Sequence, residues 1–168
     1  MPDRDSVQLH LLRHAHAGDP EGWTGPDAAR PLSAKGEQQA ERIGQFLADA
    51  GFKSDIFITS PKIRAVRTAE IVAAALGCEV REDERLARDF DLVSIEAMLF
   101  DAGEPEKPVL VGHDPDFSEI AGALVGAPRL SMRKGAFARI DADRPLEAGS
   151  GTLRWLVSPD LLGGRYAR

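Results

Sequence analysis

The segment VQLHLLRHAHA, residues 7–17, decides the fold class, because it joins an apolar strand to a cluster of basic side chains. Residues 7–12 are rich in branched apolar side chains, which is typical of a buried strand. Arg13 and His14 follow directly. Ligand sites of open α/β sheets lie in loops past the carboxyl ends of the strands. The Arg–His pair therefore offers a fixed cation beside a nucleophile or an acid–base group.

Strands alternate with helices along the rest of the chain. Apolar spacing predicts helices at 33–50, 60–76, 94–102 and 114–126, and strands at 55–59, 78–81, 109–112, 136–141 and 152–157. Ser33, Ser60 and Asp114 are the expected N-caps, and a Pro follows each of the last two at the first helical position. This alternation predicts a layered α/β protein with a largely parallel sheet.

Size and charge exclude several classes of function. The 168 residues, 43% apolar and 29% charged, indicate one globular domain spanning 1–168. A net charge of −6 argues against binding to nucleic acid or to an anionic membrane. No apolar run is long enough to span a membrane. Residues 1–6 lack the apolar core of a signal peptide, and Cys78 is the only cysteine, so we expect a cytoplasmic protein.

Three strand-to-helix junctions carry candidate chemistry: RH at 13–14, SPKIRAVRT at 60–68 and GHD at 112–114. In a parallel sheet these junctions share one edge. Arg64 would lie in the first turn of its helix, where free N–H groups already favour an anion. Two arginines can grip phosphoryl oxygens, one histidine can attack phosphorus, and a second, protonated histidine can donate to the oxygens. The pattern predicts a phosphate-handling site.

The same motifs resemble a known family. LRHA at 12–15, SPKIRAVRTA at 60–69 and VGH at 111–113 are similar, in this order, to the histidine phosphatase superfamily, which contains phosphoglycerate mutases and acid phosphatases. DAARPLSAKG at 27–36 and WLVSP at 155–159 resemble its SixA-type phosphohistidine phosphatases. The resemblance implies a three-layer α/β/α sandwich with a mainly parallel central sheet, as in the phosphoglycerate mutases.

The resemblance also implies roles for four residues. His14 would be the nucleophile that becomes phosphorylated, and water would then release the phosphate. Arg13, Arg64 and His113 would bind the phosphoryl group. Neither a cofactor nor a metal ion is implied. The expected partner is a phosphorylated protein, such as a phosphohistidine-bearing phosphotransfer domain of a signalling pathway, or a small phosphorylated molecule.

Two positions depart from the pattern of the family. Ala15 stands where Gly is usual, and Arg88 stands where the mutases have a carboxylate proton donor. An alkoxide leaving group needs such a donor, whereas imidazole, with a conjugate acid of pKa about 6.5, leaves more easily. The departure therefore favours phosphohistidine as substrate. The carboxylates that could still supply a proton are Asp83, Glu84, Asp89 and Asp91.

The remaining polar residues near the junctions are interpreted mainly as structural. His16 is expected at the rim of the pocket, His10 as a hydrogen-bonded core or interface histidine, and Arg67 in a surface ion pair. Asp27 and Arg30 are expected to order the first loop, from which Arg30 would also reach the substrate.

Three alternatives to a phosphohistidine phosphatase stay open. The first is a small-molecule phosphomonoesterase on the same fold, which a panel of substrates would distinguish. The second is a metal hydrolase, because His14 and His16 are spaced like a metal-binding pair. The third is a phosphohistidine-binding module without activity, to which the missing acid points.

Overall fold

The computed structural model describes residues 5–163, so residues 1–4 and 164–168 of the predicted domain lie outside the description. Ten helices and strands and four short 3-10 turns follow one another along the described chain. In chain order they are β1 Ser6–Arg13, η1 Pro20–Gly22, η2 Asp27–Ala29, α1 Ala34–Asp49, β2 Ile56–Thr59, α2 Ile63–Leu76, β3 Val80–Glu82, η3 Glu84–Ala87, α3 Leu92–Asp101, β4 Pro108–Gly112, α4 Asp116–Val125, β5 Phe137–Asp143, β6 Gly151–Val157 and η4 Pro159–Leu161.

The six strands form one sheet in the order β3-β2-β4-β1-β5-β6. The first four strands in this order are parallel, whereas β5 and β6 extend the sheet in antiparallel fashion. Arg13 pairs with Gly112 and Thr59 pairs with Val111, so β1, β4 and β2 end at the same level. The sheet therefore brings the three predicted junctions to one edge.

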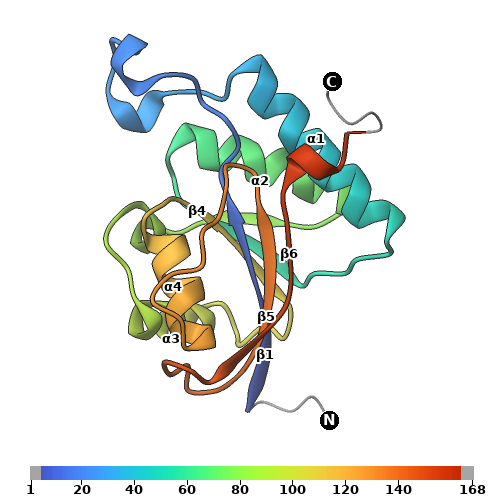
Figure 1. Cartoon of the computed structure of the whole chain (residues 1–168), viewed down its shortest axis with the longest axis vertical. Coiled ribbons are helices and arrows are strands. Elements are labelled where there is room, and N and C mark those ends of the chain that lie inside the picture. Colours follow the sequence, from blue (N-terminus) through green and yellow to red (C-terminus); the bar gives the residue numbers. More distant parts are fainter. Residues whose placement is uncertain (1–4, 164–168) are drawn as a thin grey trace.

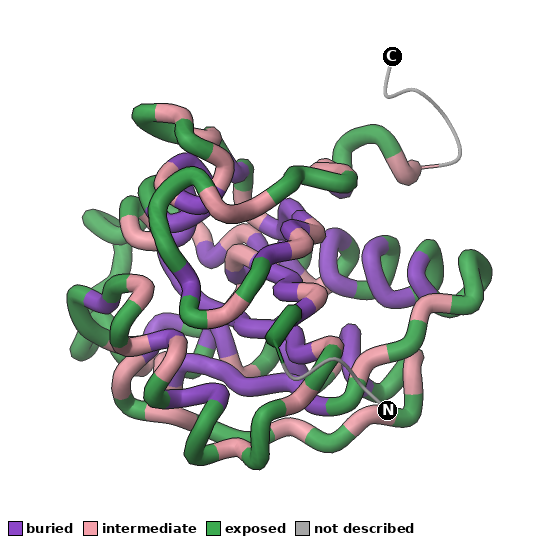
Figure 2. Tube along the Cα trace, turned by 90° about the horizontal axis from the view of Figure 1, so that it is seen from below, coloured by how far each residue is buried: buried purple, intermediate pink, exposed green. Residues whose placement is uncertain are grey.

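Two apolar clusters cover the two faces of the sheet. One cluster joins α1 and α2 to the inner strands through buried side chains such as Phe57 and Val109. The other joins α3 and α4 to the opposite face, through Leu11 and Leu110 among others. Figure 1 shows the two pairs of helices on either side of the sheet, and Figure 2 shows the buried residues concentrated between them. The predicted three-layer α/β/α sandwich with a mainly parallel sheet is confirmed.

Strand β1 lies inside the sheet and is apolar on both faces. The side chains of Leu9, Leu11 and Leu12 are all 0% exposed. Strands covered by helices on both faces have continuous apolar runs rather than alternating ones. This burial fixes the position of the Arg13–His14 junction at the end of the strand.

Two helices begin later than predicted. Helix α2 begins at Ile63 with Lys62 as N-cap, and α4 begins at Asp116 with Pro115 as N-cap. Ser60 contacts His113 of another junction, and Asp114 contacts Arg13 while it still accepts an N–H in the first turn of α4. Ser33, by contrast, caps α1 as predicted, because its hydroxyl accepts the N–H of Gly36.

Smaller differences affect an edge strand and α3. The edge strand predicted at 78–81 is β3, at Val80–Glu82. Helix α3 begins at Leu92 rather than at residue 94, because Asp91 caps it by accepting the N–H of Ser94. Within the described residues, no helix combines the length and the apolar character that crossing a membrane requires.

His10 is buried in the core, but only one of its ring nitrogens has a partner, which corrects the expectation of a fully hydrogen-bonded histidine. Nδ1 lies 3.0 Å from the carbonyl oxygen of Pro108, whereas no hydrogen-bond partner faces Nε2. The rings of Phe52, Phe137 and Trp155 surround it. Burial lowers the pKa of His10 to about 4, so the ring is neutral at physiological pH.

The first turn of α1 touches the backbone of the loop that follows His14. A Cβ atom added at Gly36 would lie 2.0 Å from the carbonyl oxygen of His16. We predict that Gly36→Ala lowers the free energy of unfolding by about 1–3 kcal/mol, measured by urea denaturation. Gly22→Ala is the matched control, because its Cβ would meet only Asp19 Cβ at 4.0 Å. Equal stability of the two variants would contradict this prediction.

Candidate active site

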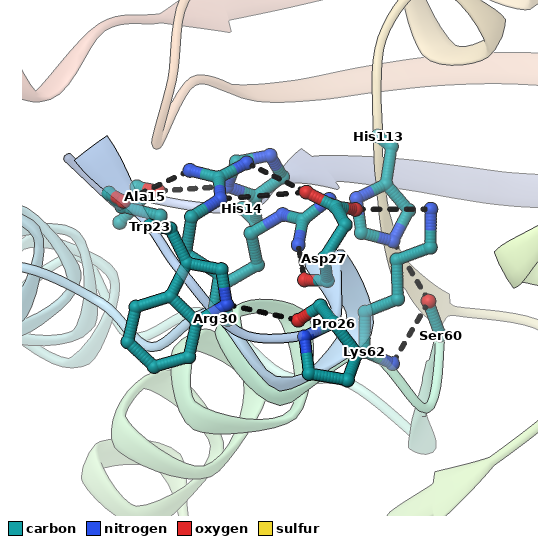
Figure 3. Close-up of polar contacts among 11 residues, drawn as sticks. His14, Ala15, Trp23, Pro26, Asp27, Arg30, Ser60, Lys62 and His113 are labelled. Atoms are coloured by element: carbon teal, nitrogen blue, oxygen red, sulfur yellow. Dashed lines mark hydrogen bonds and ion pairs between the residues drawn. The ribbon is translucent and has the colours of Figure 1, made fainter. Parts of the chain in front are cut away.

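The ends of β1, β2 and β4 bring the predicted site residues together. The N–H of His14 donates to the carbonyl oxygen of Gly112, and the N–H of Ser60 donates to that of Val111, both at 2.9 Å. The imidazole rings of His14 and His113 lie 5.1 Å apart between centroids. Figure 3 shows these side chains facing a common region above the sheet edge.

His14 is held in the protonation state of a nucleophile. Its Nδ1 lies 2.7 Å from the carbonyl oxygen of Ala15, which can only accept, so Nδ1 carries the proton and Nε2 a free lone pair. Burial lowers the pKa of His14 to about 3, and the charges of Arg64 and Arg13 act in the same direction. His14 is therefore neutral and nucleophilic at physiological pH.

Ala15 is accommodated where the family usually has Gly. Its side chain is fully buried, and its N–H donates to the hydroxyl of Thr68 at 3.1 Å. The same hydroxyl donates to the carbonyl oxygen of Arg64 at 2.7 Å. Thr68 thus connects the loop after β1 to the first turn of α2.

Arg13 is oriented by groups that flank it in the junction before α4 and in the loop before β5. Its Nη1 donates to the carbonyl oxygen of Met132 at 2.8 Å and lies 3.3 Å from a carboxylate oxygen of Asp114. Asp114 in turn accepts the N–H and the hydroxyl of Ser118. Asp114 therefore binds the helix N-terminus, as expected, and also positions Arg13. The Nε of Arg13 is buried and has no hydrogen-bond partner within residues 5–163.

Arg64 lies in the first turn of α2 as predicted, and Asp27 occupies two of its donors. Nη1 donates to the backbone carbonyl of Asp27 at 2.8 Å, and Nη2 donates to its carboxylate at 2.9 Å. The Nε of Arg64 is buried, and no group in the described part of the chain accepts a hydrogen bond from it. The carboxylate of Asp27 also lies 3.3 Å from Arg30 and 3.9 Å from Lys62, as Figure 3 shows. Asp27 thus orders the loop and also places a carboxylate on Arg64, which was predicted to bind the phosphoryl group.

Asp27 is ionised in this arrangement. Partial burial raises its pKa, but hydrogen bonds and charges from Arg64 and Arg30 outweigh it and leave the pKa below its ordinary value. An ionised carboxylate beside Arg64 accepts hydrogen bonds and cannot donate one.

His113 is neutral, which corrects the expectation of a protonated donor. Burial lowers its pKa to about 2, and electrostatic interactions with His14, Lys62 and Arg64 act in the same direction. A neutral imidazole can still donate from the nitrogen that carries its proton. The hydrogen-bond partner of one ring nitrogen decides whether Nδ1 or Nε2 of His113 carries the proton.

Ser60 determines the tautomer of His113. Its hydroxyl lies 2.7 Å from Nε2 of His113 and accepts the N–H of Lys62 at 3.3 Å. Ser60 is fully buried, so a hydroxyl proton without an acceptor would be costly. The hydroxyl therefore donates to Nε2, and the proton of His113 lies on Nδ1, which is buried and has no protein partner. Ser60 takes part in the site rather than in helix capping.

None of the four candidate acids contacts these residues in the described structure. Asp83 accepts from Arg85, and Asp91 accepts from Ser94 at the start of α3. No hydrogen bond or ion pair joins Glu84 or Asp89 to the site. A proton donor among these four carboxylates stays a prediction, and their contacts do not support it.

The other polar residues are mostly structural. His16 lies beside the site with its Nδ1 2.6 Å from the hydroxyl of Ser33. Arg67 forms a bidentate ion pair with Glu37, which confirms the predicted surface pair. Arg30 is buried and donates to the carbonyl oxygen of Ala17 at 2.8 Å. Among the described residues, no three His, Cys, Asp or Glu side chains are grouped to hold a metal ion.

Two lysines near the site were not predicted. Lys62 approaches Asp27, and Lys134 lies in the turn before β5. The N–H of Gly135, next to Lys134, donates to the carbonyl oxygens of Arg13 and His14. Lys62 lies in the 60–68 junction but was given no role there, and Lys134 lies outside every motif, so only the packing of the loops could reveal their positions.

Comparison with known sequences identifies the family. A sequence model of the histidine phosphatase superfamily (branch 1) matches residues 9–120, which is more than half of the chain. An uncharacterised protein of Picosynechococcus sp. is 38% identical over 121 residues, covering 70% of this chain and 73% of that protein. The probable phosphoglycerate mutase GpmB of Salmonella paratyphi C is 37% identical over 97 residues, covering 57% of this chain and only 44% of GpmB.

Solved structures share the fold. The protein histidine phosphatase SixA in complex with tungstate matches with a TM-score of 0.79 and 23% identity, over 93% of this chain and 99% of that one. The α-ribazole phosphatase of Shigella flexneri matches with a TM-score of 0.70 and 20% identity, over 91% and 97% of the two chains. With the sequence match and the geometry described above, these findings place the chain in branch 1 of the histidine phosphatase superfamily.

Proposed function

We propose that this protein is a phosphatase that acts through phosphorylated His14 and removes phosphate from phosphohistidine in a protein. One observation carries the proposal: a neutral His14 with a free Nε2 lies among buried N–H groups that have no acceptor among the described residues. These groups are Nε of Arg13, Nε of Arg64 and Nδ1 of His113. Buried donors are normally paired, so this set favours a bound anion next to the nucleophile.

The reaction has two steps. In the first, Nε2 of His14 bonds to phosphorus while the bond from phosphorus to the substrate imidazole breaks, and the electron pair stays on the imidazole, which takes a proton from water. In the second, a water oxygen bonds to phosphorus while the bond from phosphorus to Nε2 breaks, and the electron pair returns to Nε2. One proton of this water stays on the inorganic phosphate that leaves, and the other neutralises the hydroxide left by the first step. Arg13, Arg64 and His113 stabilise the oxygens in both steps.

The protonation states favour a P–N bond as the one that is broken. Asp27, the carboxylate that contacts Arg64, is ionised, and the four sequence candidates lie without contacts to the site. Imidazole needs less help from an acid than an alkoxide does, because its conjugate acid has a pKa of about 6.5. Phosphohistidine therefore fits the residues better than a phosphate ester.

The SixA likeness agrees with this proposal. That protein is named a protein histidine phosphatase and was solved with tungstate, a tetrahedral oxyanion like phosphate. By analogy, the partner of this chain would be a phosphohistidine-bearing phosphotransfer domain, and its location would be the cytoplasm. No metal or cofactor enters the proposed steps.

A small-molecule phosphomonoesterase is the second candidate, and the position of Asp27 favours it. A phosphoryl group that binds Arg64 would displace the carboxylate that now accepts from it. Without this partner the pKa of Asp27 would rise, and a protonated Asp27 could then serve a leaving alkoxide. A panel of phosphoramidate, phosphohistidine peptides and sugar or nucleotide esters separates the two candidates by kcat/KM.

We predict that His14→Ala abolishes turnover, because no other group supplies the attacking lone pair. Intact mass after a brief phosphoramidate pulse, quenched without acid, should show a phosphate adduct on the wild type and none on the variant. His16→Ala is the matched control and should keep the adduct. Unchanged phosphate release by His14→Ala would overturn the mechanism.

The lowered pKa of His14 predicts the pH dependence of kcat/KM. A pKa of about 3 means that His14 loses its lone pair to a proton only in strong acid. Between about pH 5 and pH 8 the profile, corrected for substrate ionisation, should therefore show no acid limb from this residue. An acid limb with an apparent pKa near 6.5, the ordinary value for histidine, would contradict the buried, neutral state of His14.

Ser60→Ala tests the tautomer of His113. We expect kcat to fall about 10-fold or more, because His113 loses the group that keeps its proton on Nδ1. The ¹⁵N shifts of His113 should change from the Nδ1–H pattern toward a mixture, and Ser60→Thr should restore both readouts. Ser54→Ala is the control, since Ser54 donates only to carbonyls at the other end of β2. An unchanged tautomer in Ser60→Ala would refute this role.

A further inference from the structure

Two lysines beside the site have no partner in the described structure. Lys134 is half-buried in the turn before β5, and Lys35 is exposed in the first turn of α1. Neither side chain makes a hydrogen bond or ion pair with any described residue. In a chain of net charge −6, such a pair of unneutralised cations at one place requires an explanation.

The backbone places both lysines next to the loop that carries His14 and His16. The N–H of Gly135 donates to the carbonyl oxygens of Arg13 and His14 at 3.1 and 3.0 Å, which fixes the turn that holds Lys134. Lys35 follows the N-cap Ser33, whose hydroxyl donates to the carbonyl oxygen of His16. Both lysines therefore flank the same segment of the chain.

Positive charge accumulates around Lys134. Burial and neighbouring charges lower the pKa of Lys134, and the groups responsible are all cations: Arg13, Arg30, Lys35 and Arg64. His16 also has a lowered pKa, first from burial and then from Lys134, Lys35 and Arg30. Repulsion of this kind raises the energy of the free protein and is relieved when an anion binds.

The other cations of the site, unlike Lys35 and Lys134, have carboxylate partners among the described residues. Arg13 lies beside Asp114, and Arg64 lies beside Asp27, which also faces Lys62. Each of these cations therefore has a carboxylate in the free protein. Lys35 and Lys134 have none, so they are free to bind a second negative group while Arg13 and Arg64 hold the first.

We propose that Lys35 and Lys134 form a second anion subsite, on the His16 side of the phosphoryl site, for a carboxylate or phosphate that the substrate carries beside the transferred phosphoryl group. The subsite rests on the proposed function in one respect, because it assumes that the phosphoryl group lies at His14. It predicts that substrates with an anionic group beside the phosphoryl group are preferred over substrates whose only anionic group is the phosphoryl group. Acidic side chains around a phosphohistidine, or a second anion of a small molecule, would supply that charge.

Binding of non-hydrolysable phosphonates tests the subsite without turnover. Titration calorimetry should show that phosphonates with a carboxylate at the end of an alkyl chain, tried at several chain lengths, bind about fivefold to tenfold more tightly than methylphosphonate. The ratio of the two affinities is the readout, so that a general loss of positive charge cancels. Lys35→Met/Lys134→Met should bring this ratio to within about twofold of one.

A matched control removes a lysine elsewhere. Lys107 lies half-buried directly before β4, at the opposite end of that strand from His113, and Lys107→Met should keep the ratio of the wild type. If no chain length raises affinity in the wild type, or if the double lysine variant keeps the full ratio, the subsite does not exist. An equal fall for both ligands would instead assign Lys134 to the phosphoryl site and also overturn the proposal.

Kinetics then identify the source of the second charge. Phosphohistidine peptides flanked by Asp and Glu are compared with the same peptides carrying Asn and Gln, and carboxylate-bearing phosphate esters are compared with neutral esters. A KM preference for the acidic peptides that disappears in Lys35→Met/Lys134→Met indicates a protein substrate, and the same pattern among esters indicates a small molecule. Turnover of phosphoramidate tests the proposed phosphatase function independently of the subsite. Failure of the subsite proposal therefore leaves the proposed function testable, and the reverse also holds.

Discussion

The structure depends on the burial of a neutral histidine at the end of the central strand. Because β1 is covered on both faces, His14 leaves the sheet already desolvated, and its pKa falls to about 3. The contact of Nδ1 with the carbonyl of Ala15 then leaves the lone pair on Nε2. The chemistry of the site follows from these two facts, because a nucleophile must be both unprotonated and oriented. The packing of the sheet, the helices and the loops excludes water from the imidazole of His14 and fixes its orientation.

The positively charged side chains around His14 repel one another, and carboxylates beside them reduce this repulsion. Asp114 orients Arg13, and Asp27 occupies Arg64 while ordering the first loop. Both carboxylates lower the cost of gathering positive charge in the absence of an anion, and both leave the Nε atoms of the arginines free. The ionised state of Asp27 and the neutral state of His113 agree with the proposed role of the site in binding phosphate.

Much of the fold and of the site could be predicted from local patterns. The apolar run of β1 and the strand-to-helix junctions with Arg13, Arg64 and His113 lie in short segments, so their order implied a parallel sheet edge. The beginnings of α2 and α4 could not be predicted, because the local signal of Ser60 and Asp114 is that of an N-cap. Ser60 contacts His113 in the folded protein, whereas Asp114 accepts an N–H of α4 and also contacts Arg13. The charge of His113 was also mistaken, since burial is a property of the packed molecule.

The sequence by itself determined the fold class, the family resemblance and the residues that meet at the sheet edge, because periodicity and motif order are carried by neighbouring residues. Only the tertiary structure decided protonation states, the partner of Ser60, the position of Asp27 and the unpaired lysines. These features depend on distances between segments far apart in the chain, such as the 2.7 Å contact between residues 60 and 113. Desolvation and Coulomb interactions act across such distances irrespective of chain order, and no local pattern records them.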